Sequence, residues 1–312
     1  MACGAGRALL PGPDGRCGAC RDRALDRGRG TGSVRGRRQA AGGRRQAEGG
    51  RQKGSRDGQS PNRFKAALRA GHPQIGIWNA IPQPMIAGLL AGCGFDWVLV
   101  DTEHAPMEVR DVLPALQAIA AHPAASAVVR VAINDRVLIK RHLDQGAQSL
   151  MVPYAQSRQE AEQAVRAMRY PPRGVRGVAG ITRARRFGLI PDCIACAEQE
   201  LCLIVQVETR AGLERPEEIA TVEGVDGVFI GPADLAASLG FPGQAGHPEV
   251  AAAIEGAIAR LAAVGVPSGI LSTDAAFARR CMALGTAFTA LGIDVALLAR
   301  AVGALRAEVA CG

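Results

Sequence analysis

Hydrophobic and polar positions follow two recurring patterns from residue 62 onward. The first pattern is a short, nearly uninterrupted apolar run, which is typical of a parallel strand covered on both faces. Eight such runs occur: Gln74–Trp78, Trp97–Asp101, Ala127–Val131, Ser149–Pro153, Leu203–Glu208, Gly227–Gly231, Ser268–Ser272 and Ala287–Leu291. We therefore predict eight strands.

The second pattern lies between these runs. Apolar residues recur there every three or four positions, which predicts amphipathic helices. The clearest segments are Val109–Ala120, Val137–Leu143, Arg158–Met168, Pro248–Ala263, Asp274–Leu284 and Val295–Val309. Gly146, Gly265 and Gly285 each follow a helical segment, as expected for a glycine that ends a helix.

The alternation of eight strands with helices predicts the fold. Both the number of units and the length of this part of the chain fit an α/β protein of the (β/α)8 TIM-barrel type, which has about 250 residues. A doubly wound open sheet is the alternative, but it usually has a Gly-x-Gly-x-x-Gly turn after its first strand. The stretch Gly71–Ile77 lacks that turn. A barrel places its chemistry at the carboxyl ends of the strands, so the polar residues there are the candidates.

Three ionisable residues, Asp101, Glu103 and His104, follow the second predicted strand directly. Arg130 lies inside the apolar third strand. Such an arginine must be paired or face a polar cavity, because an isolated buried charge is very costly. Each residue also has a purely structural interpretation, Arg130 as an ion-pair partner and His104 as a loop histidine.

Two carboxylates end successive predicted strands. Glu208 ends the fifth strand, on the same face as Gln206, and Asp234 follows the sixth. Neighbouring carboxylates repel unless a cation lies between them or one is protonated. Their oxygen atoms suit Mg²⁺ or Mn²⁺. The alternative is that Asp234 only caps the short helix predicted at Leu235–Leu239.

The positive charge of the chain is confined to its beginning. The net charge is +8, but residues 1–60 hold 14 basic and 5 acidic side chains, and residues 61–312 hold 23 and 24. The first segment has 15 glycines and no aromatic residue. We predict that it is a disordered extension, or sequence upstream of the true start of translation, and that residues 61–312 form the barrel domain. A nucleic-acid-binding arm is the alternative, although no aromatic residue is present to stack on bases.

The cysteines and the lengths of the apolar runs indicate where in the cell the protein is located. Nine cysteines are scattered irregularly, which favours reduced thiols in a cytoplasmic protein. Cys193 and Cys196 have CxxC spacing, but they lie in a helical pattern, so we expect a helix rather than redox chemistry. No run of 18 apolar residues occurs, so we expect no membrane span. Because residues 61–312 are nearly neutral, we also expect no nucleic-acid partner.

At the strand-end residues the chain resembles the HpcH/HpaI family of class II, metal-dependent pyruvate aldolases. The resemblance runs from about Phe64 to Arg306 and does not include residues 1–60. The matching stretches are Gly94–Pro106 (GFDWVLVDTEHAP), Val128–Arg130, Arg169–Val178 (RYPPRGVRGV), Val205–Glu214 (VQVETRAGLE), Glu223–Gly240 and Gly292–Ala301.

The resemblance implies a role for each matching site residue. It implies that His104 is the general base and that Arg130 stabilises the enolate. It implies that Glu208 and Asp234 bind the divalent metal, and that Gln206 with the backbone of Ala233 and Asp234 holds the 2-oxo acid. Finally, it implies that Asp144 raises the basicity of the histidine. A plain barrel puts Asp144 at the opposite face, so Asp101 and Glu103 are rival partners for His104.

The implied reaction is the reversible cleavage of a 4-hydroxy-2-oxo acid, such as 4-hydroxy-2-oxoheptanedioate, to pyruvate and an aldehyde such as succinate semialdehyde. The implied cofactor is Mg²⁺ or Mn²⁺, with Co²⁺ or Zn²⁺ as alternatives, and the implied assembly is a dimer or hexamer that exchanges its last helix. The pathway would be aromatic compound catabolism. A 2-dehydro-3-deoxy sugar-acid aldolase is the alternative enzyme, because the segments Asn79–Pro84 and Ala179–Phe187 and residue Thr102 depart from the family pattern.

Overall fold

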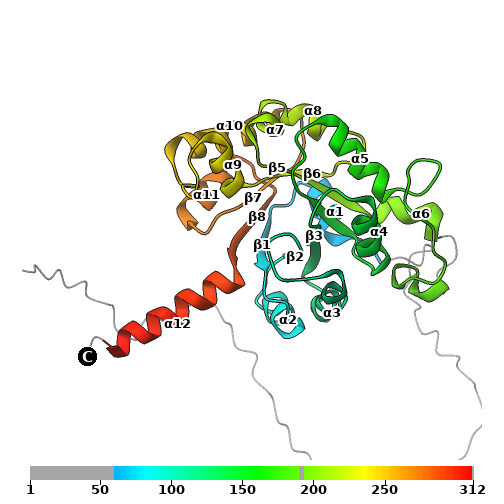
Figure 1. Cartoon of the computed structure of the whole chain (residues 1–312), viewed down its shortest axis with the longest axis horizontal. Coiled ribbons are helices and arrows are strands. Elements are labelled where there is room, and N and C mark those ends of the chain that lie inside the picture. The colour runs from blue at the N-terminus through cyan, green and yellow to red at the C-terminus, as the bar shows by residue number, and fades with distance from the viewer. Residues whose placement is uncertain (1–59, 190–192, 311–312) are drawn as a thin grey trace, which may run out of the picture. The chain divides into compact units, whose positions relative to one another are not determined.

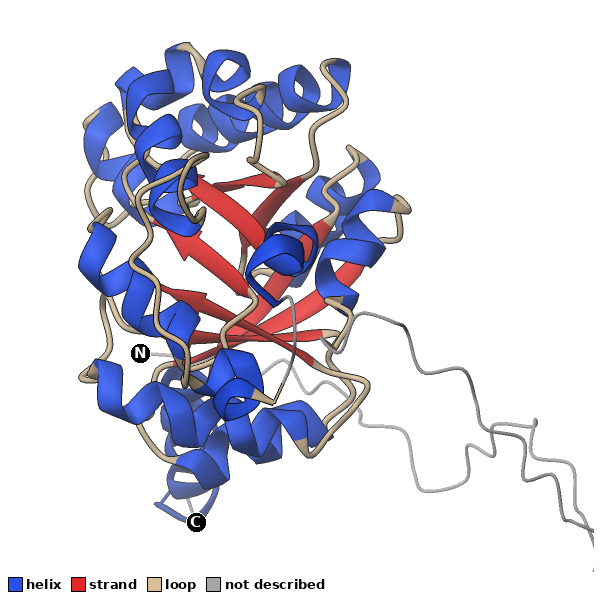
Figure 2. Cartoon of the chain, turned by 90° about the vertical axis from the view of Figure 1, so that its right-hand side faces the viewer, coloured by secondary structure: helices blue, strands red, loops and turns tan. Residues whose placement is uncertain are grey.

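The computed structural model describes residues 60–189 and 193–310. Its eight strands are parallel and pair in sequence order into one closed barrel, which confirms the predicted TIM barrel (Figures 1 and 2). Each strand lies within two residues of its predicted bounds. The strands are β1 Gln74–Asn79, β2 Trp97–Asp101, β3 Ser126–Arg130, β4 Ser149–Val152, β5 Cys202–Val207, β6 Gly227–Ile230, β7 Ser268–Leu271 and β8 Phe288–Ile293.

The helices surround the barrel, and all six that the periodicity predicted are present. Gly146, Gly265 and Gly285 have φ values of 96°, 71° and 105°, as expected where a helix ends in the left-handed region. The helices are α1 Arg63–Arg69, α2 Pro84–Gly92, α3 Val109–Ala120, α4 Arg136–Asp144, α5 Arg158–Met168, η1 Arg183–Gly188, α6 Cys193–Glu200, α7 Arg210–Glu214, α8 Pro216–Ala220, α9 Pro232–Leu239, α10 Pro248–Ala263, α11 Ala275–Ala283 and α12 Asp294–Ala310.

Aromatic side chains fill the inside of the barrel. Trp97 and Phe288 lie on strands, and Phe64 enters from α1 with its ring centroid 5.8 Å from that of Trp97 and 5.6 Å from that of Phe288. A Cβ on Gly76 would lie 2.1 Å from the Trp97 ring, so only glycine fits there. The inside is therefore a packed core at the end where the strands begin, and α1 closes that end.

Helix α12 extends away from the barrel (Figure 1). Its first residue, Asp294, is buried and accepts hydrogen bonds from Asn79 Nδ2 at 2.8 Å and from the Ala80 amide at 3.0 Å. The later apolar side chains on this helix are exposed: Val295, Leu298, Val302, Leu305 and Val309. The helix is thus anchored at its start and carries an uncovered apolar stripe.

One prediction falls outside the described residues. The prediction of disorder for residues 1–60 concerns positions 1–59, which lie outside them. In the part of the chain that the structure covers, no helix is both long and apolar enough to cross a bilayer. Cys193 and Cys196 lie on α6, so the helix expected there is confirmed.

Candidate active site

Arg130 is the centre of a buried ion-pair cluster at the carboxyl end of the barrel. It lies directly beside Asp101 in the β2–β3 register. Its Nε and Nη2 donate to the two Asp101 carboxylate oxygens at 2.9 and 2.6 Å, and its Nη1 lies 2.8 Å from Glu103 Oε2. The guanidinium also lies over the Trp78 ring, 5.1 Å from its centroid. The expectation that this arginine is paired is confirmed.

The loop after β2 carries His104 beside this cluster. The amides of Glu103 and His104 donate to Asp101 Oδ1 at 3.0 and 3.4 Å, which fixes the start of the loop. The Thr102 hydroxyl donates to the Arg130 carbonyl oxygen at 2.6 Å. His104 Nε2 lies 4.0 Å from a carboxylate oxygen of Glu103 and 4.0 Å from one of Asp234. The His104 side chain is 60% exposed, so it is open to a substrate.

Glu208 and Gln206 point inward from the end of β5 and are 1% and 2% exposed. Gln206 Nε2 donates to Glu208 Oε2, so the expectation that these side chains share one face is confirmed. A Cβ on Gly231 would lie 2.5 Å from Glu208 Oε2, so glycine is needed where β6 runs into α9. This close approach brings the Glu208 carboxylate to the start of α9.

Tyr154 joins the two carboxylates and was not singled out by sequence. Its amide donates to Glu208 Oε1 at 2.8 Å, and its hydroxyl donates to Asp234 Oδ1 at 3.0 Å. Its φ of 54° is left-handed, a costly conformation for a tyrosine that tends to occur at functional sites. Tyr154 follows β4, so the rule that polar residues at strand ends are candidates would have included it.

Asp234 is the third residue of α9, because Gly231 is the N-cap and Pro232 begins the helix. The alternative in which Asp234 only caps a helix at Leu235–Leu239 is therefore wrong, since the helix begins at Pro232, and a proline is well suited to the first helical position. The amides of Ala233 and Asp234 lie in this first turn, where helical N–H groups have no helical acceptor. The free N–H groups of such a turn are suited to binding a carboxylate.

The carboxylates at this end of the barrel have perturbed acidity. Burial raises the pKa of Glu208 to about 7, against its hydrogen bonds, and repulsion from Glu103 and Asp234 acts in the same direction. Burial likewise raises the pKa of Glu103 to about 7, against the attraction of Arg130. Burial also opposes ionisation of Asp101, but the Arg130 guanidinium outweighs it and holds the pKa of Asp101 below its usual value. Glu208 is therefore a buried carboxylate that, unlike Asp101 and Glu103, has no arginine beside it among the described residues.

These residues fit a divalent cation. Glu208 and Asp234 offer hard oxygen ligands, and a cation between them would offset the burial of the Glu208 carboxylate and its repulsion from Asp234. Among the residues that the structure describes, no group of three or more His, Cys, Asp or Glu side chains has the arrangement of a metal site. Two protein carboxylates, with water and substrate oxygens completing the set, match the way in which Mg²⁺ is usually held.

Asp144 is not brought to this site within one chain. It is the last residue of α4, which returns toward the start of β4, so it lies at the opposite end of the barrel from His104. Its Oδ1 accepts from Arg176 Nη2 at 2.9 Å. By contrast, His104, Arg130, Gln206, Glu208 and Asp234 are linked by the contacts above. The roles of all these residues in a reaction stay predictions.

The fold and this cluster define a TIM-barrel enzyme with an acidic, arginine-containing mouth. The chain belongs to the HpcH/HpaI aldolase/citrate lyase family, whose model matches residues 74–301. The resemblance inferred from sequence is thus confirmed, and the protein is a carbon–carbon lyase.

Individual relatives match about four fifths of this chain. A pyruvate aldolase of Rhizobium etli is 61% identical over 249 residues, which is 80% of this chain and 98% of the relative. A 4-hydroxy-2-oxo-heptane-1,7-dioate aldolase of Escherichia coli is 52% identical, over 79% of this chain and 94% of the relative. A crystal structure of a family member from Burkholderia cenocepacia, 41% identical, superimposes with a TM-score of 0.77 over 80% of this chain and 99% of that one.

Proposed function

We propose that the protein is a divalent-metal-dependent pyruvate aldolase that cleaves 4-hydroxy-2-oxo acids reversibly to pyruvate and an aldehyde. The observation that supports this most is the convergence of an uncompensated carboxylate pair, a fixed arginine and an exposed histidine at one barrel mouth. The names of the relatives from R. etli and E. coli support the same reaction class.

In this proposal Glu208 and Asp234 hold the metal, with Mg²⁺ or Mn²⁺ preferred for their oxygen ligands and Co²⁺ or Zn²⁺ as alternatives. When bound, the metal would supply Lewis-acid stabilisation of negative charge on the substrate oxygens. Gln206 and the amides of Ala233 and Asp234 bind and orient the 2-oxo acid. The α9 first turn favours the carboxylate of the acid, because its N–H groups and the helix dipole both present positive charge.

The acid–base step falls to His104. Its exposed imidazole accepts the proton of the C4 hydroxyl, directly or through one water, and the C3–C4 bond then breaks to release the aldehyde. Arg130 faces the enolate that remains and stabilises its negative charge. Asp101 and Glu103 hold the guanidinium in place, so it needs no reorganisation during the reaction.

A Schiff-base route is not supported. Lys65 is buried beside Asp226 at 3.1 Å, at the barrel end that α1 closes, and Lys140 lies on α4. Neither amine lies at the mouth with His104 and Arg130. A nucleophilic lysine would have to reach the substrate carbonyl there.

We further propose that the enzyme is a cytoplasmic homo-oligomer, a dimer or hexamer. The uncovered apolar stripe on α12 supports association with a second copy. An oligomer would also give Asp144 a route to His104, because the two residues lie at opposite ends of one barrel. The free thiols of Cys93, Cys202 and Cys281 agree with a reducing compartment.

The natural aldehyde is proposed as succinate semialdehyde, from 4-hydroxy-2-oxoheptanedioate, in aromatic compound catabolism. The alternative is a 2-dehydro-3-deoxy sugar acid. Comparing kcat/KM for pyruvate release from the two substrate types distinguishes them.

The metal assignment is tested by measuring pyruvate release with Mg²⁺ or Mn²⁺ and after chelation. Glu208→Gln keeps the shape of the side chain and removes one anionic ligand, so we expect turnover to fall at least about 100-fold. The matched control is Glu162→Gln on α5, an exposed glutamate whose ion pair is with Arg158. Full activity after chelation, or in Glu208→Gln, would refute the metal-dependent mechanism.

A further inference from the structure

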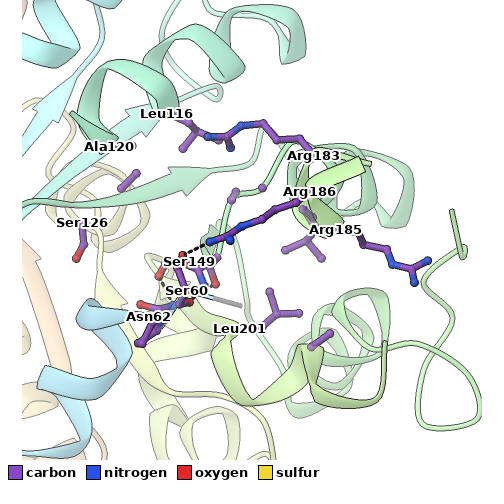
Figure 3. A pocket seen from close by; sticks show the side chains of 18 of the residues that line it. Ser60, Asn62, Leu116, Ala120, Ser126, Ser149, Arg183, Arg185, Arg186 and Leu201 are labelled. Atoms are coloured by element: carbon purple, nitrogen blue, oxygen red, sulfur yellow. Dashed lines mark hydrogen bonds between the residues drawn. The ribbon is translucent and has the colours of Figure 1, made fainter. Parts of the chain in front are cut away.

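A second cavity lies at the end of the barrel where the strands begin. It has a volume of about 530 Å³ and is lined by five arginines, Arg63, Arg176, Arg183, Arg185 and Arg186. In Figure 3 the side chains of Arg183 and Arg186 reach toward α3 and toward Ser60. Asp144 lies at this same end, and in the proposed oligomer this end meets His104 of a second copy. In that assembly the cavity would face a mouth, so it is not a separate site.

The rim of the mouth beside β1 is built within one chain. The β1–α2 loop, residues 80–83, follows Asn79 at the carboxyl end of β1. Asp294, the first residue of α12, accepts hydrogen bonds from the amides of Ala80 and Ile81, both at 3.0 Å. It also accepts one from Asn79 Nδ2 at 2.8 Å. The first residue of the last helix therefore anchors the loop after the first strand.

The Asp294 carboxylate depends on this loop for its hydrogen bonds. Asp294 is 5% exposed, and its fourth described donor is the amide of Val295 in its own helix, at 2.7 Å. A buried carboxylate is costly unless donors bind it. If the loop moved away, three of these four hydrogen bonds would be lost while the charge stayed buried. The loop and the start of α12 therefore hold each other in place.

The loop is also closed within itself. Asn79 Nδ2 donates to the Ile81 carbonyl oxygen at 3.0 Å, and the Gln83 amide donates to the same oxygen at 2.7 Å. Pro82 has a fixed φ, and Pro84 begins α2. Because the loop has little internal freedom, its anchor on Asp294 sets the position of the whole loop.

This loop begins at the ion-pair cluster of the active site. Trp78, the residue before Asn79, donates from Nε1 to Asp101 Oδ2 at 3.3 Å, and the Arg130 guanidinium lies over its ring. In the closed barrel β1 lies between β2 and β8 and faces β5 across the mouth. The loop is therefore on the side of His104, which follows β2, and opposite Gln206 on β5.

The proposed reaction gives this side of the mouth to the aldehyde half of the substrate. The 2-oxo acid lies on Gln206 and the first turn of α9, and the C4 hydroxyl lies at His104, so the carbons beyond C4 extend toward the loops after β1 and β2. The β1–α2 loop presents Ala80, Ile81 and Pro82, which are apolar and half-buried. Such side chains suit an aliphatic chain.

We propose that Asp294 is a positioning residue for substrate selectivity: it holds the β1–α2 loop where the aliphatic carbons beyond C4 pack against it. Asp294 touches no reacting atom and acts through the loop. This inference rests on the proposed aldolase reaction, and it adds that the chain selects for longer aliphatic aldehydes from a helix outside the mouth.

The test compares two aldehydes in the direction of synthesis, with pyruvate and Mg²⁺ present. Succinate semialdehyde is long enough to reach the loop, whereas acetaldehyde is not. Asp294→Asn keeps the shape of the side chain but turns an amino group toward N–H donors. We expect kcat/KM for succinate semialdehyde to fall at least about tenfold, because small misplacements of a binding loop are costly. The values for acetaldehyde, and the KM for pyruvate, should stay within about twofold.

Asp274→Asn is the matched control. Asp274 also stands at the start of a helix, α11, but its described side-chain partner is the Ala276 amide of that same helix, at 2.8 Å. It should leave both aldehydes unchanged. Asn79→Ala removes the loop's side-chain contact with Asp294 and leaves the Val295 contact in place, so it should shift selectivity in the same direction. It decides the matter if Asp294→Asn does not fold.

The outcomes separate this inference from the proposed reaction. A purely structural role would lower the thermal midpoint and reduce kcat/KM for both aldehydes alike. Equal losses, or unchanged selectivity in a folded variant of an active enzyme, would overturn the positioning role alone. A wild type that condenses neither aldehyde with pyruvate would overturn the proposed reaction, and the positioning role with it.

Discussion

At the scale of single residues, the site contains buried charged side chains that stabilise one another. Arg130 binds Asp101 in a two-point contact and reaches Glu103 with its third nitrogen. Breaking a buried pair by removing one partner leaves an uncompensated charge and is strongly destabilising. Conservative changes next to this cluster are therefore more informative than changes to Arg130 itself.

Tyr154→Phe is such a change. It removes only the hydroxyl that donates to Asp234 Oδ1, and it keeps the backbone amide that donates to Glu208. A hydrogen bond to a charged group contributes about 1.5 kcal/mol, so we expect activity at limiting metal to fall roughly tenfold. The diagnostic measurement is the metal concentration for half-maximal activity, which should rise.

Tyr170→Phe is the control for that measurement, because Tyr170 lines the cavity at the other end of the barrel. A purely structural role for the Tyr154 hydroxyl would lower the thermal midpoint in Tyr154→Phe and leave the metal dependence unchanged. That result would contradict the idea that Tyr154 positions the carboxylates.

His142 is a buried histidine, and its lowered pKa makes the stability of the folded protein depend on pH. It is 1% exposed on α4, and burial, with a further contribution from Arg141, lowers its pKa from 6.5 to about 4. Between these values the unfolded chain binds a proton that the folded chain does not, so stability falls as pH falls from 6.5 to 4. At pH 5 this amounts to about 2 kcal/mol relative to pH 7.

The measurement is urea unfolding at pH 7 and pH 5 for the wild type and for His142→Leu, a change of similar volume without the titrating group. We expect the difference between the two pH values to shrink by about 2 kcal/mol in the variant. An equal pH dependence in both proteins would rule out this cause.

At the scale of elements, α12 is the helix whose sequence most clearly anticipates a partner. Its exposed apolar residues recur at alternating steps of three and four, which places them on one side of the helix. Such a stripe usually forms the interface along which two helices pack. Since the barrel does not cover it, a second copy is the occupant that we propose.

The double variant Leu298→Asp, Leu305→Asp places two negative charges in this helix interface. Each buried leucine contributes about 1.5 to 3 kcal/mol, so we expect association to weaken at least about 100-fold. Analytical ultracentrifugation should show smaller species, while Arg300→Asp on the opposite side of α12 should leave the assembly unchanged. An unaltered sedimentation coefficient in the double variant would refute the α12 interface.

Elements also show where sequence patterns lose accuracy. The strands were predictable because each is a short apolar run bounded by polar or turn residues, as in Trp97–Asp101. Helix α9 begins at Pro232, three residues before the predicted Leu235, because a proline is well suited to the first turn of a helix. Asp234 therefore lies inside the first turn of α9 and is not its cap.

At the scale of the whole molecule, the net charge of the chain and the charge of its sites are separate matters. The excess basic residues lie in positions 1–60, while the mouth is acidic around Glu208 and the second cavity is lined by arginines. Local fields of this kind govern small charged ligands more than the net charge does.

Deleting residues 1–59 tests the independence of the barrel domain. We expect kcat/KM to stay within about twofold, because the sequence of those residues lacks the apolar side chains needed for a core. Nucleic-acid binding at low salt, if the full-length protein shows any, should disappear with them. A large loss of aldolase activity would contradict the proposed domain boundary.

The sequence by itself determined the eight-stranded barrel, the family and the set of strand-end residues, because periodicity, parallel pairing and side-chain alternation are local rules. Only the tertiary structure decided which side chains meet. It placed Tyr154 between Glu208 and Asp234, put Asp144 with Arg176 at the far end, and gathered arginines from α1 and η1 around one cavity. Those contacts join residues distant in the chain, and their distances depend on how the barrel closes and its loops fold back, which no local pattern specifies.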